Sequence, residues 1–189
     1  MTDPRAVELE AILRGSPDLM TVMETARDLA LPEWLIFSGA IYQRVLNHLT
    51  GRPDNYGIKD YDLGYFDLDT SYEAEDAVIR QVATSFNPPL DAMVEVRNQA
   101  RVHLWFQMKF GEEYAPLGGT EEALERFVSP LFAVGARLEV DGAMTIIAPF
   151  GLEDLFAMRL RPNPRRVTAG FPRTSAAIAK RWPEVKIEP

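Results

Sequence analysis

Residues 34–67, WLIFSGAIYQRVLNHLTGRPDNYGIKDYDLGYFD, carry the pattern that decides the fold. The stretch opens with a short apolar run, 34–37, that is typical of a buried strand. Ser38-Gly39 marks a turn, and a helix over 40–49 follows, because apolar side chains recur there every four residues. A loop that contains glycine and proline then leads into a second strand over 61–66. The pattern predicts a strand, helix, strand unit.

The flanking sequence continues this alternation of helices and strands. Apolar spacing predicts further helices over 5–14, 18–30, 72–85, 99–110, 120–127, 152–159 and 174–182, and further strands over 93–96, 136–140 and 144–148. Asp141-Gly142, between the last two strands, is a strong hairpin signal. We therefore predict an α/β (α+β) fold with a mixed β-sheet flanked by helices and with a C-terminal β-hairpin and helices. The length fits a single domain over 1–189, with a core at about 18–110 and an extension over about 111–189.

Composition excludes several classes of protein. Hydrophobic residues make up 47% of the 189 residues and charged residues 25%, which is ordinary for a globular protein. Without cysteine and with two histidines, the chain has no disulfide, thiolate metal site or cysteine nucleophile, and little material for a histidine-rich zinc site. No apolar run approaches the roughly 18 residues of a membrane span, and the N-terminus lacks the apolar run of a signal peptide. We expect a soluble cytoplasmic protein without a membrane partner.

Charge is distributed unevenly along the chain. The net charge is -8, yet residues 159–189 hold eight basic and two acidic side chains. The acidic body would repel a nucleic-acid backbone, so a nucleic-acid partner is not expected. Two interpretations of the basic segment are open: docking on the acidic body, which we favour, or binding of an anion such as a triphosphate. The arginines concerned are Arg159, Arg161, Arg165 and Arg166.

Two acidic residues lie where the strand over 61–66 begins. Asp60 and Asp62 point to the same side, because side chains alternate along a strand with a period of two. Two carboxylates on one face repel each other unless a cation neutralises them, and Mg²⁺ prefers a few carboxylates with waters and phosphates. The alternative is a solvated acidic edge. Asp67 and Asp69 have the opposite parity and are interpreted as turn residues.

A third acid, Glu95, lies within the apolar run 92–96. A carboxylate between apolar neighbours costs free energy unless it is exposed or paired. Glu95 is therefore either an exposed residue of a half-buried strand or a member of the same site as Asp60 and Asp62. Two acids with a third on the next strand form a known geometry for two-metal phosphoryl or nucleotidyl transfer.

The Ser38-Gly39 turn joins a strand to a helix. Ser38 is able to cap the helix, and Gly39 lets a ligand approach the backbone closely. The helix N-terminus presents free N–H groups to phosphates. An ordinary tight turn with a capped helix is the alternative.

Together these segments resemble the nucleotidyltransferase superfamily typified by DNA polymerase β, and more narrowly a bacterial family of small nucleotidyltransferase-like proteins. The resemblance rests on SGAIYQRVLNHLTGRPDNYGIKDYDLGYFD, MVEVRNQARVHLWF and APFGLEDLFAMRLRPNP, and it covers most of the chain. It implies that Asp60, Asp62 and Glu95 are catalytic and bind two Mg²⁺ ions. It further implies that Ser38 and Gly39 hold the triphosphate of a nucleotide.

Other residues near these motifs take secondary roles. The cations nearest to the acids in sequence are Lys59, Arg97 and Arg101. We assign them to the nucleotide phosphates; the alternative is that they are solvated surface charges. Asn98 is predicted to cap the following helix. His103 is interpreted as a hydrogen-bonded core residue, and Trp105 and Phe106 as core rather than as a platform for a nucleobase.

The sequence thus predicts a Mg²⁺-dependent nucleotidyltransferase that moves a nucleoside monophosphate from a nucleoside triphosphate (NTP) to an unknown small-molecule or protein acceptor. The complete set of three acids favours this function. Gly39 is followed by Ala40, where the superfamily usually has Gly-Ser or Gly-Gly, and this favours the alternative of a catalytically inactive nucleotide-binding or partner-binding regulatory module. A structural protein with a solvated acidic strand is a third interpretation.

Overall fold

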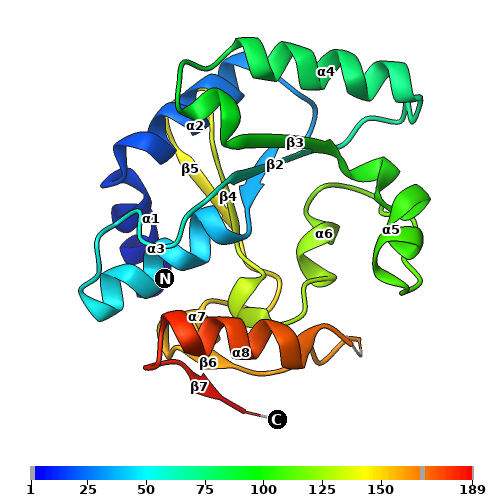
Figure 1. The fold of residues 1–189 in the computed structure, drawn as a ribbon. Helices are drawn as coiled ribbons and strands as arrows, with labels where there is room; N and C mark the ends of the chain where they lie inside the picture. Colours follow the sequence, from blue (N-terminus) through cyan, green and yellow to red (C-terminus); the bar gives the residue numbers. More distant parts are fainter. Residues whose placement is uncertain (1–2, 167–168, 189) are drawn as a thin grey trace.

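The computed structural model describes residues 3–166 and 169–188 (Figure 1). Its helices are α1 Pro4–Arg14, α2 Pro17–Leu29, α3 Gly39–Thr50, α4 Tyr72–Thr84, α5 Val102–Phe110, α6 Glu122–Glu125, α7 Glu153–Phe156 and α8 Phe171–Arg181. Its strands are β1 Leu35–Phe37, β2 Tyr61–Tyr65, β3 Val94–Asn98, β4 Gly135–Leu138, β5 Met144–Ile147, β6 Arg159–Leu160 and β7 Lys186–Ile187. None of the helices in these two ranges has the length and apolar character that a membrane crossing requires.

The larger sheet has five strands in the order β3-β2-β1-β4-β5. β2 and β3 run parallel, whereas β1 pairs antiparallel with β2 and with β4. β4 and β5 form the antiparallel hairpin that the sequence predicts around its Asp-Gly turn. Parallel neighbours require a crossover connection, and α4 lies between β2 and β3 in the chain. The sheet is therefore mixed and flanked by helices, as predicted.

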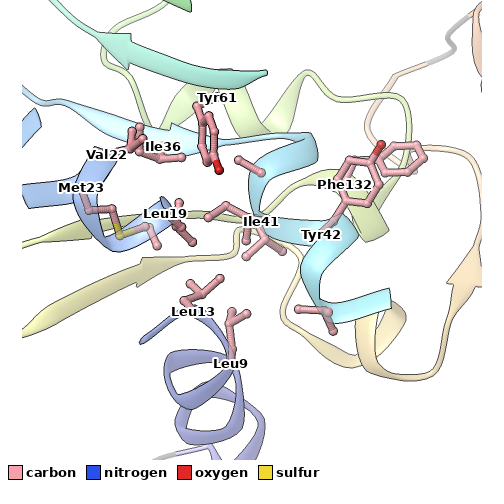
Figure 2. Close-up of a cluster of buried hydrophobic side chains, with 14 of the residues drawn as sticks. Leu9, Leu13, Leu19, Val22, Met23, Ile36, Ile41, Tyr42, Tyr61 and Phe132 are labelled. Carbon is pink, nitrogen blue, oxygen red and sulfur yellow. The ribbon is translucent and has the colours of Figure 1, made fainter. Parts of the chain in front are cut away.

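One face of the sheet packs against α1, α2 and α3 (Figure 2). The large apolar side chains buried there include Leu9, Leu13, Leu19, Val22, Met23, Ile36 and Ile41. Burying a side chain of this size contributes about 1.5–3 kcal/mol, so this core is the main apolar contribution to stability. Tyr61 and Leu63 of β2 also point into it. Because strand side chains alternate, the residues between them point to the opposite face.

The opposite face carries a smaller apolar cluster under α6. Its buried members are Leu35, Phe37, Leu124 and Ala133. A Cβ atom on Gly64 would lie 2.5 Å from Cε1 of Phe37, so the glycine leaves room for the Phe37 ring directly over β2. This cluster covers only part of the face, and the β2–β3 edge beside it holds the polar residues described below.

Buried polar contacts fix the end of β3. Glu75 of α4 accepts a hydrogen bond from the backbone N–H of Asn98 at 2.9 Å and pairs with Arg101 at 3.1 Å. The Asn98 side chain caps the turn that follows, as predicted, and donates to the carbonyl of Asp67 at 2.9 Å. The Asp67 side chain accepts from the N–H of Asp69 at 2.8 Å, so these acids are turn residues, as predicted. The contacts hold β3 in register with β2 and set the start of α5.

Two helices in the C-terminal half are shorter than the sequence indicates. The helices predicted over 120–127 and 152–159 are wrong in extent, because α6 and α7 each have four residues. Asp154 is buried in α7 and accepts hydrogen bonds from Nε of Arg159 at 2.6 Å and from Nε of Arg161 at 2.7 Å. These bonds draw the chain out of the helix and into β6, which pairs in parallel with β7. The pattern of apolar residues alone does not show that polar contacts end a helix at this point.

The basic C-terminal segment docks on the acidic body, in agreement with the favoured interpretation. Its ion pairs join Arg159 and Arg161 to Asp154, Arg165 to Glu125, and Arg166 to Glu112. Partly exposed pairs of this kind contribute about 0–1 kcal/mol each, so they orient the segment more than they stabilise it. Its anchor is the fully buried Trp182, whose indole donates to Oδ1 of Asn47 at 3.0 Å.

Candidate active site

Three carboxylates converge where β2 and β3 begin. Asp62 lies opposite Glu95 in the parallel strand pair, and Asp60 immediately precedes β2 with the same parity as Asp62. Across the antiparallel pair, Asp62 lies opposite Phe37 of β1. The acids therefore share the face that the large core does not cover. The structure brings together all three acids that the sequence singles out.

Burial and neighbouring negative charges raise the pKa values of two of these carboxylates. The pKa of Asp62 is raised to about 6, chiefly by burial and further by the negative charges of Asp60 and Glu95. Burial and the charge of Glu95 likewise raise the pKa of Asp60. Within residues 3–166 and 169–188, none of the three forms an ion pair with a basic side chain. The negative charge of the cluster is therefore not offset by an ion pair in the described part of the chain.

The chemistry of this donor set fits a divalent ion that is shared with a substrate. In the part of the chain that the structure describes, no three His, Cys, Asp or Glu side chains are placed so that they alone hold a metal ion. Mg²⁺ usually takes one or two carboxylates together with waters and substrate phosphates, and seldom an all-protein cage. Uncompensated carboxylates with raised pKa values are the donors that such an ion would neutralise.

The turn between β1 and α3 is strained. Ser38 has φ 65° and ψ -140°, a conformation that residues other than glycine rarely adopt. Its hydroxyl lies beside Asp62 and partly offsets the rise in the pKa of that carboxyl. Ser38 stands at the N-cap position, but its side chain makes no capping hydrogen bond to α3 within the described residues. The expected capping role is therefore wrong, and the strained turn instead aims the hydroxyl at the acids.

Gly39 starts α3 in a confined position. A Cβ atom there would lie 2.5 Å from Nε2 of Gln43, so glycine is required as long as Gln43 folds over the turn. The first described backbone hydrogen bond of the helix runs from the N–H of Ile41 to the carbonyl of Ser38 at 3.1 Å. The N–H groups of Gly39 and Ala40 precede this ladder, as at any helix start, although both residues are buried in the free protein.

Replacing Ser38 with glycine is expected to stabilise the protein. Relief of the positive φ is expected to raise the free energy of unfolding by about 1 kcal/mol, after the greater backbone entropy of glycine is subtracted. The lost hydroxyl should also raise the pKa of Asp62 further. Urea unfolding measures the first effect and a carboxyl NMR titration the second. Ser71→Gly is the control, because Ser71 has an ordinary φ of -66°. If both substitutions lowered the free energy of unfolding equally, the backbone strain at Ser38 would be contradicted.

The predicted cations occupy different environments. Lys59 is exposed, and its charge opposes the rise in the pKa of Asp60. Arg97 follows Glu95 on the same face of β3 and lowers the pKa of Asp62. Arg101 is instead engaged by the ion pair at the end of β3. Lys59 and Arg97 are thus placed beside the acids, whereas Arg101 supports the fold.

A further cation, which sequence reasoning missed, comes from the C-terminal helix. Nη1 of Arg181 lies 3.2 Å from the carbonyl oxygen of Gly57 and 3.4 Å from Oε1 of Gln43. Tyr42 is close to both groups: burial raises its pKa most, the charge of Arg181 lowers it, and the charge of Asp62 raises it. Arg181 is 138 residues from Gln43 in sequence, and the basic composition of the segment was the only signal of this contact.

A pocket of about 200 Å³ adjoins the acids. Asp62 and Glu95 line one part of it, and Trp105 and Phe106 of α5 line another. Trp105 and Phe106 are half-buried and lie outside the buried clusters, so their interpretation as core residues is wrong. The prediction for His103 is also wrong in part, because its buried Nδ1 has no hydrogen-bond partner within the described residues.

Comparison with known proteins agrees with the fold. A family model for nucleotidyltransferases matches residues 24–187, and the chain therefore belongs to this family. An NMR structure described as revealing a CCA-adding enzyme head domain matches with a TM-score of 0.74 and 23% identity over 95% of each chain. This likeness shows a shared fold. No curated protein matches the sequence. The predicted family, the mixed nucleotidyltransferase-like fold and the class of enzyme are confirmed.

Proposed function

We propose that this nucleotidyltransferase moves a nucleoside monophosphate from an NTP to a small-molecule or protein acceptor in a reaction that depends on Mg²⁺. The observation that carries the proposal is the set of Asp60, Asp62 and Glu95, which lie close enough to interact and form no ion pair within the described residues. Such an arrangement costs stability in the free protein. This cost is explained if a cation and a substrate bind to the carboxylates and neutralise their charge.

The proposed roles follow the positions of the side chains. Asp60, Asp62 and Glu95 would hold two Mg²⁺ ions together with oxygens of the triphosphate. Bound there, the ions would neutralise the developing charge and lower the pKa of the acceptor hydroxyl. Glu95 would accept the acceptor's proton, since it lies on the pocket side of the acids. Asp62 would stay ionised once a cation offsets its raised pKa.

The phosphate chain would lie along the turn at the start of α3. The N–H groups of Ser38 and Gly39, with the helix N-terminus, favour a negative charge at this point. Lys59 and Arg97 would contact phosphate oxygens from the two sides of the acids. We place the enzyme in the cytoplasm, where NTPs are available. The acidic body argues against a nucleic-acid substrate.

Arg181 is proposed as a third phosphate contact, from α8. Its hydrogen bonds to the Gly57 carbonyl and to Gln43 are long, at 3.2 and 3.4 Å, and leave the guanidinium free to bind an anion as well. Loss of a charge-assisted hydrogen bond to phosphate should weaken Mg·NTP binding about tenfold in Arg181→Gln. Calorimetric titration with a non-hydrolysable NTP measures this change.

Arg173→Gln is the matched control, because Arg173 is an exposed residue of the same helix. It removes the same charge from α8 and should leave the affinity within about twofold, as expected of a screened surface charge. Equal weakening by both variants would indicate a general charge effect. Wild-type affinity in Arg181→Gln would remove this residue from the site.

A labelled-substrate assay tests the reaction itself. The protein is incubated with each NTP, labelled at either the α- or the γ-phosphate, together with the small-molecule or the protein fraction of a bacterial extract as the acceptor source. The proposal predicts that the α-label enters an acceptor and that the γ-label leaves as pyrophosphate, both only with Mg²⁺. Release of the γ-label as orthophosphate would contradict nucleotidyl transfer.

The inactive regulatory module remains the second candidate. Ala40 stands where a second small polar or glycine residue would help to hold the triphosphate, and this observation favours binding without turnover. This candidate predicts Mg²⁺-dependent NTP binding with no release of pyrophosphate from any NTP and any acceptor fraction. The labelled-substrate assay therefore separates the two candidates.

A further inference from the structure

The pocket beside the acids has an aromatic wall that the proposed function does not yet use. Trp105 and Phe106 of α5 line it together with Tyr114, and Phe37 and Phe127 line it from the sheet side. Figure 1 shows α5 and α6 beyond the end of β3, on the side away from α4. The same pocket reaches Asp62 and Glu95. An apolar cavity that ends at a few polar groups is the usual form of a small-molecule site.

The aromatic residues are arranged before any ligand binds. The ring of Phe106 lies 4.4 Å from that of Tyr114 and 6.1 Å from that of Trp105, centroid to centroid. Phe37 and Phe127 meet edge to face at 5.8 Å. These separations fall within the range in which aromatic pairs attract each other. The rings therefore support one another and are positioned to receive a further ring.

Tyr114 lies beside two arginines, of which Arg126 also lines the pocket. The guanidinium groups of Arg126 and Arg166 lie 5.9 and 6.0 Å from the centre of its ring. Arg126 pairs with Glu122, and Arg166 pairs with Glu112, both at 2.8 Å or less. Arg166 of the basic C-terminal segment and Arg126 thus support the wall of the pocket, which is a role distinct from the phosphate contact proposed for Arg181.

Trp105 and Phe106 leave part of their large apolar surface uncovered at the pocket. Burial of aromatic surface is favourable, so in the free protein these side chains do not reach their most stable environment. A flat apolar ligand would cover them. The space suffices for one, because an engineered cavity of about 150 Å³ holds a benzene molecule.

We propose that this pocket binds a planar aromatic ring of a substrate whose reacting atoms lie at Asp62 and Glu95. The inference rests on the proposed function and specifies its substrate class. Ser38 and Gly39 do not line the pocket. The phosphate chain is proposed to lie at the turn that these two residues form. The ring in the pocket therefore belongs to a part of the two reactants that lies on the other side of the α-phosphate. Its source is either the nucleobase of the NTP or an aromatic ring of the acceptor.

Three probes separate these sources: Mg·ATP, Mg·tripolyphosphate and 4-methylphenol. The first has a base and a phosphate chain, the second only the chain, and the third only a ring. Their dissociation constants are measured for the wild type, for Phe106→Ala and for Trp105→Leu by ligand-detected NMR. Met108→Ala is the control, because Met108 is an exposed residue of the same helix that does not line the pocket.

Each source has its own signature. If the pocket takes the nucleobase, Phe106→Ala weakens Mg·ATP about fivefold or more, a typical loss for a stacked base, and leaves Mg·tripolyphosphate unchanged. If the pocket takes an acceptor ring, both phosphate ligands bind as in the wild type, and only 4-methylphenol is weakened. Either result supports the proposal, provided that Met108→Ala binds all probes normally.

The opposite results are equally distinct. Wild-type affinities for Mg·ATP and 4-methylphenol in both aromatic variants would overturn the ring site, even if the nucleotide site stands. So would a wild type that binds no 4-methylphenol and binds Mg·ATP no better than Mg·tripolyphosphate. A third result is that neither phosphate ligand binds the wild type, while Phe106→Ala loses the binding of 4-methylphenol that the wild type shows. This result would contradict the proposed function and support the ring site. Melting curves identify any variant that is unfolded, and the other variant then decides.

Discussion

Asp62→Asn is expected to abolish nucleotidyl transfer while making the metal-free protein more stable. Loss of a group that stabilises the reacting phosphate should lower the rate by about 10³-fold or more. The stability gain has a separate cause, because the folded protein raises the pKa of Asp62 from 3.8 to about 6. Such a shift corresponds to about 3 kcal/mol against the ionised form, and since the residue is half-buried we expect a gain of about 1–3 kcal/mol.

The sign of this effect depends on pH in a testable way. At about pH 3 and below, the carboxyl is mostly protonated in both the folded and the unfolded chain, so it contributes almost no penalty. As the pH rises from about 4 to 6, the unfolded chain ionises first and the folded state loses relative stability. Urea unfolding in EDTA should therefore show the gain of Asp62→Asn at pH 7 and little gain at pH 4.

Asp141→Asn is the matched control for this variant. Asp141 lies in the β4–β5 turn, where its side chain accepts from the N–H of Ala143 at 2.9 Å, and Asn-Gly is as suitable for a hairpin turn as Asp-Gly. The control should retain both activity and wild-type stability. If the Asp62→Asn variant unfolds more readily at pH 7 than the wild type, the charge of Asp62 does not destabilise the metal-free protein, and this explanation is wrong.

Lowering the pH from 7.5 to 5 is expected to weaken Mg²⁺ and Mg·NTP binding about tenfold. Protons compete with the metal for Asp62, and with a pKa of about 6 only about a tenth of this carboxyl is ionised at pH 5. The pKa of Asp60 is also raised, which adds to the effect in the same direction. Calorimetric titration across this pH range measures the change.

The Asp62→Asn variant shows whether Asp62 causes this pH dependence. The residual binding of Asp62→Asn should depend on pH much less than that of the wild type, since the group with the largest shift is gone. A wild-type affinity that stays constant between pH 7.5 and 5 would show that Asp62 does not hold the ion. A decrease that persists in full in Asp62→Asn would assign the titration to another group.

The N-terminal half of the fold and the β4–β5 hairpin were predictable because their signals are local. The run 34–37, the helix that follows and the strand that carries Asp62 each have a clear apolar pattern, and the structure confirms them. The hairpin around Asp141 was found from two residues, because an Asp-Gly turn strongly restricts the backbone. In these segments, local propensity and the final packing agree.

The C-terminal half was less predictable because its structure depends on distant partners. α7 ends early where Asp154 binds two arginines that follow it, and α8 is anchored by the contact of Trp182 with Asn47, 135 residues away. The parallel β6–β7 pair has two residues in each strand, too few for a period to be recognised. Contacts of this kind leave no pattern in a single sequence.

The candidate site divides in the same way. The positions of Asp60, Asp62 and Glu95 followed from strand parity, since parallel strands bring equivalent residues together. The role of Ser38 was mistaken because its positive φ is not readable from its residue type. The aromatic wall was taken for core because apolar spacing does not distinguish a buried ring from one that lines a pocket. Arg181 and Tyr114 enter the site region only through tertiary packing.

The most direct test of the account is the equilibrium binding of a non-hydrolysable NTP, with and without Mg²⁺, to the wild type and to Asp60→Asn/Asp62→Asn. Isothermal titration calorimetry at pH 7.5 measures both affinities. The account predicts binding to the wild type that requires Mg²⁺ and is lost in the double variant, while that variant remains folded. Binding without Mg²⁺, or undiminished Mg²⁺-dependent binding to the double variant, would contradict a metal-dependent nucleotide site at these carboxylates.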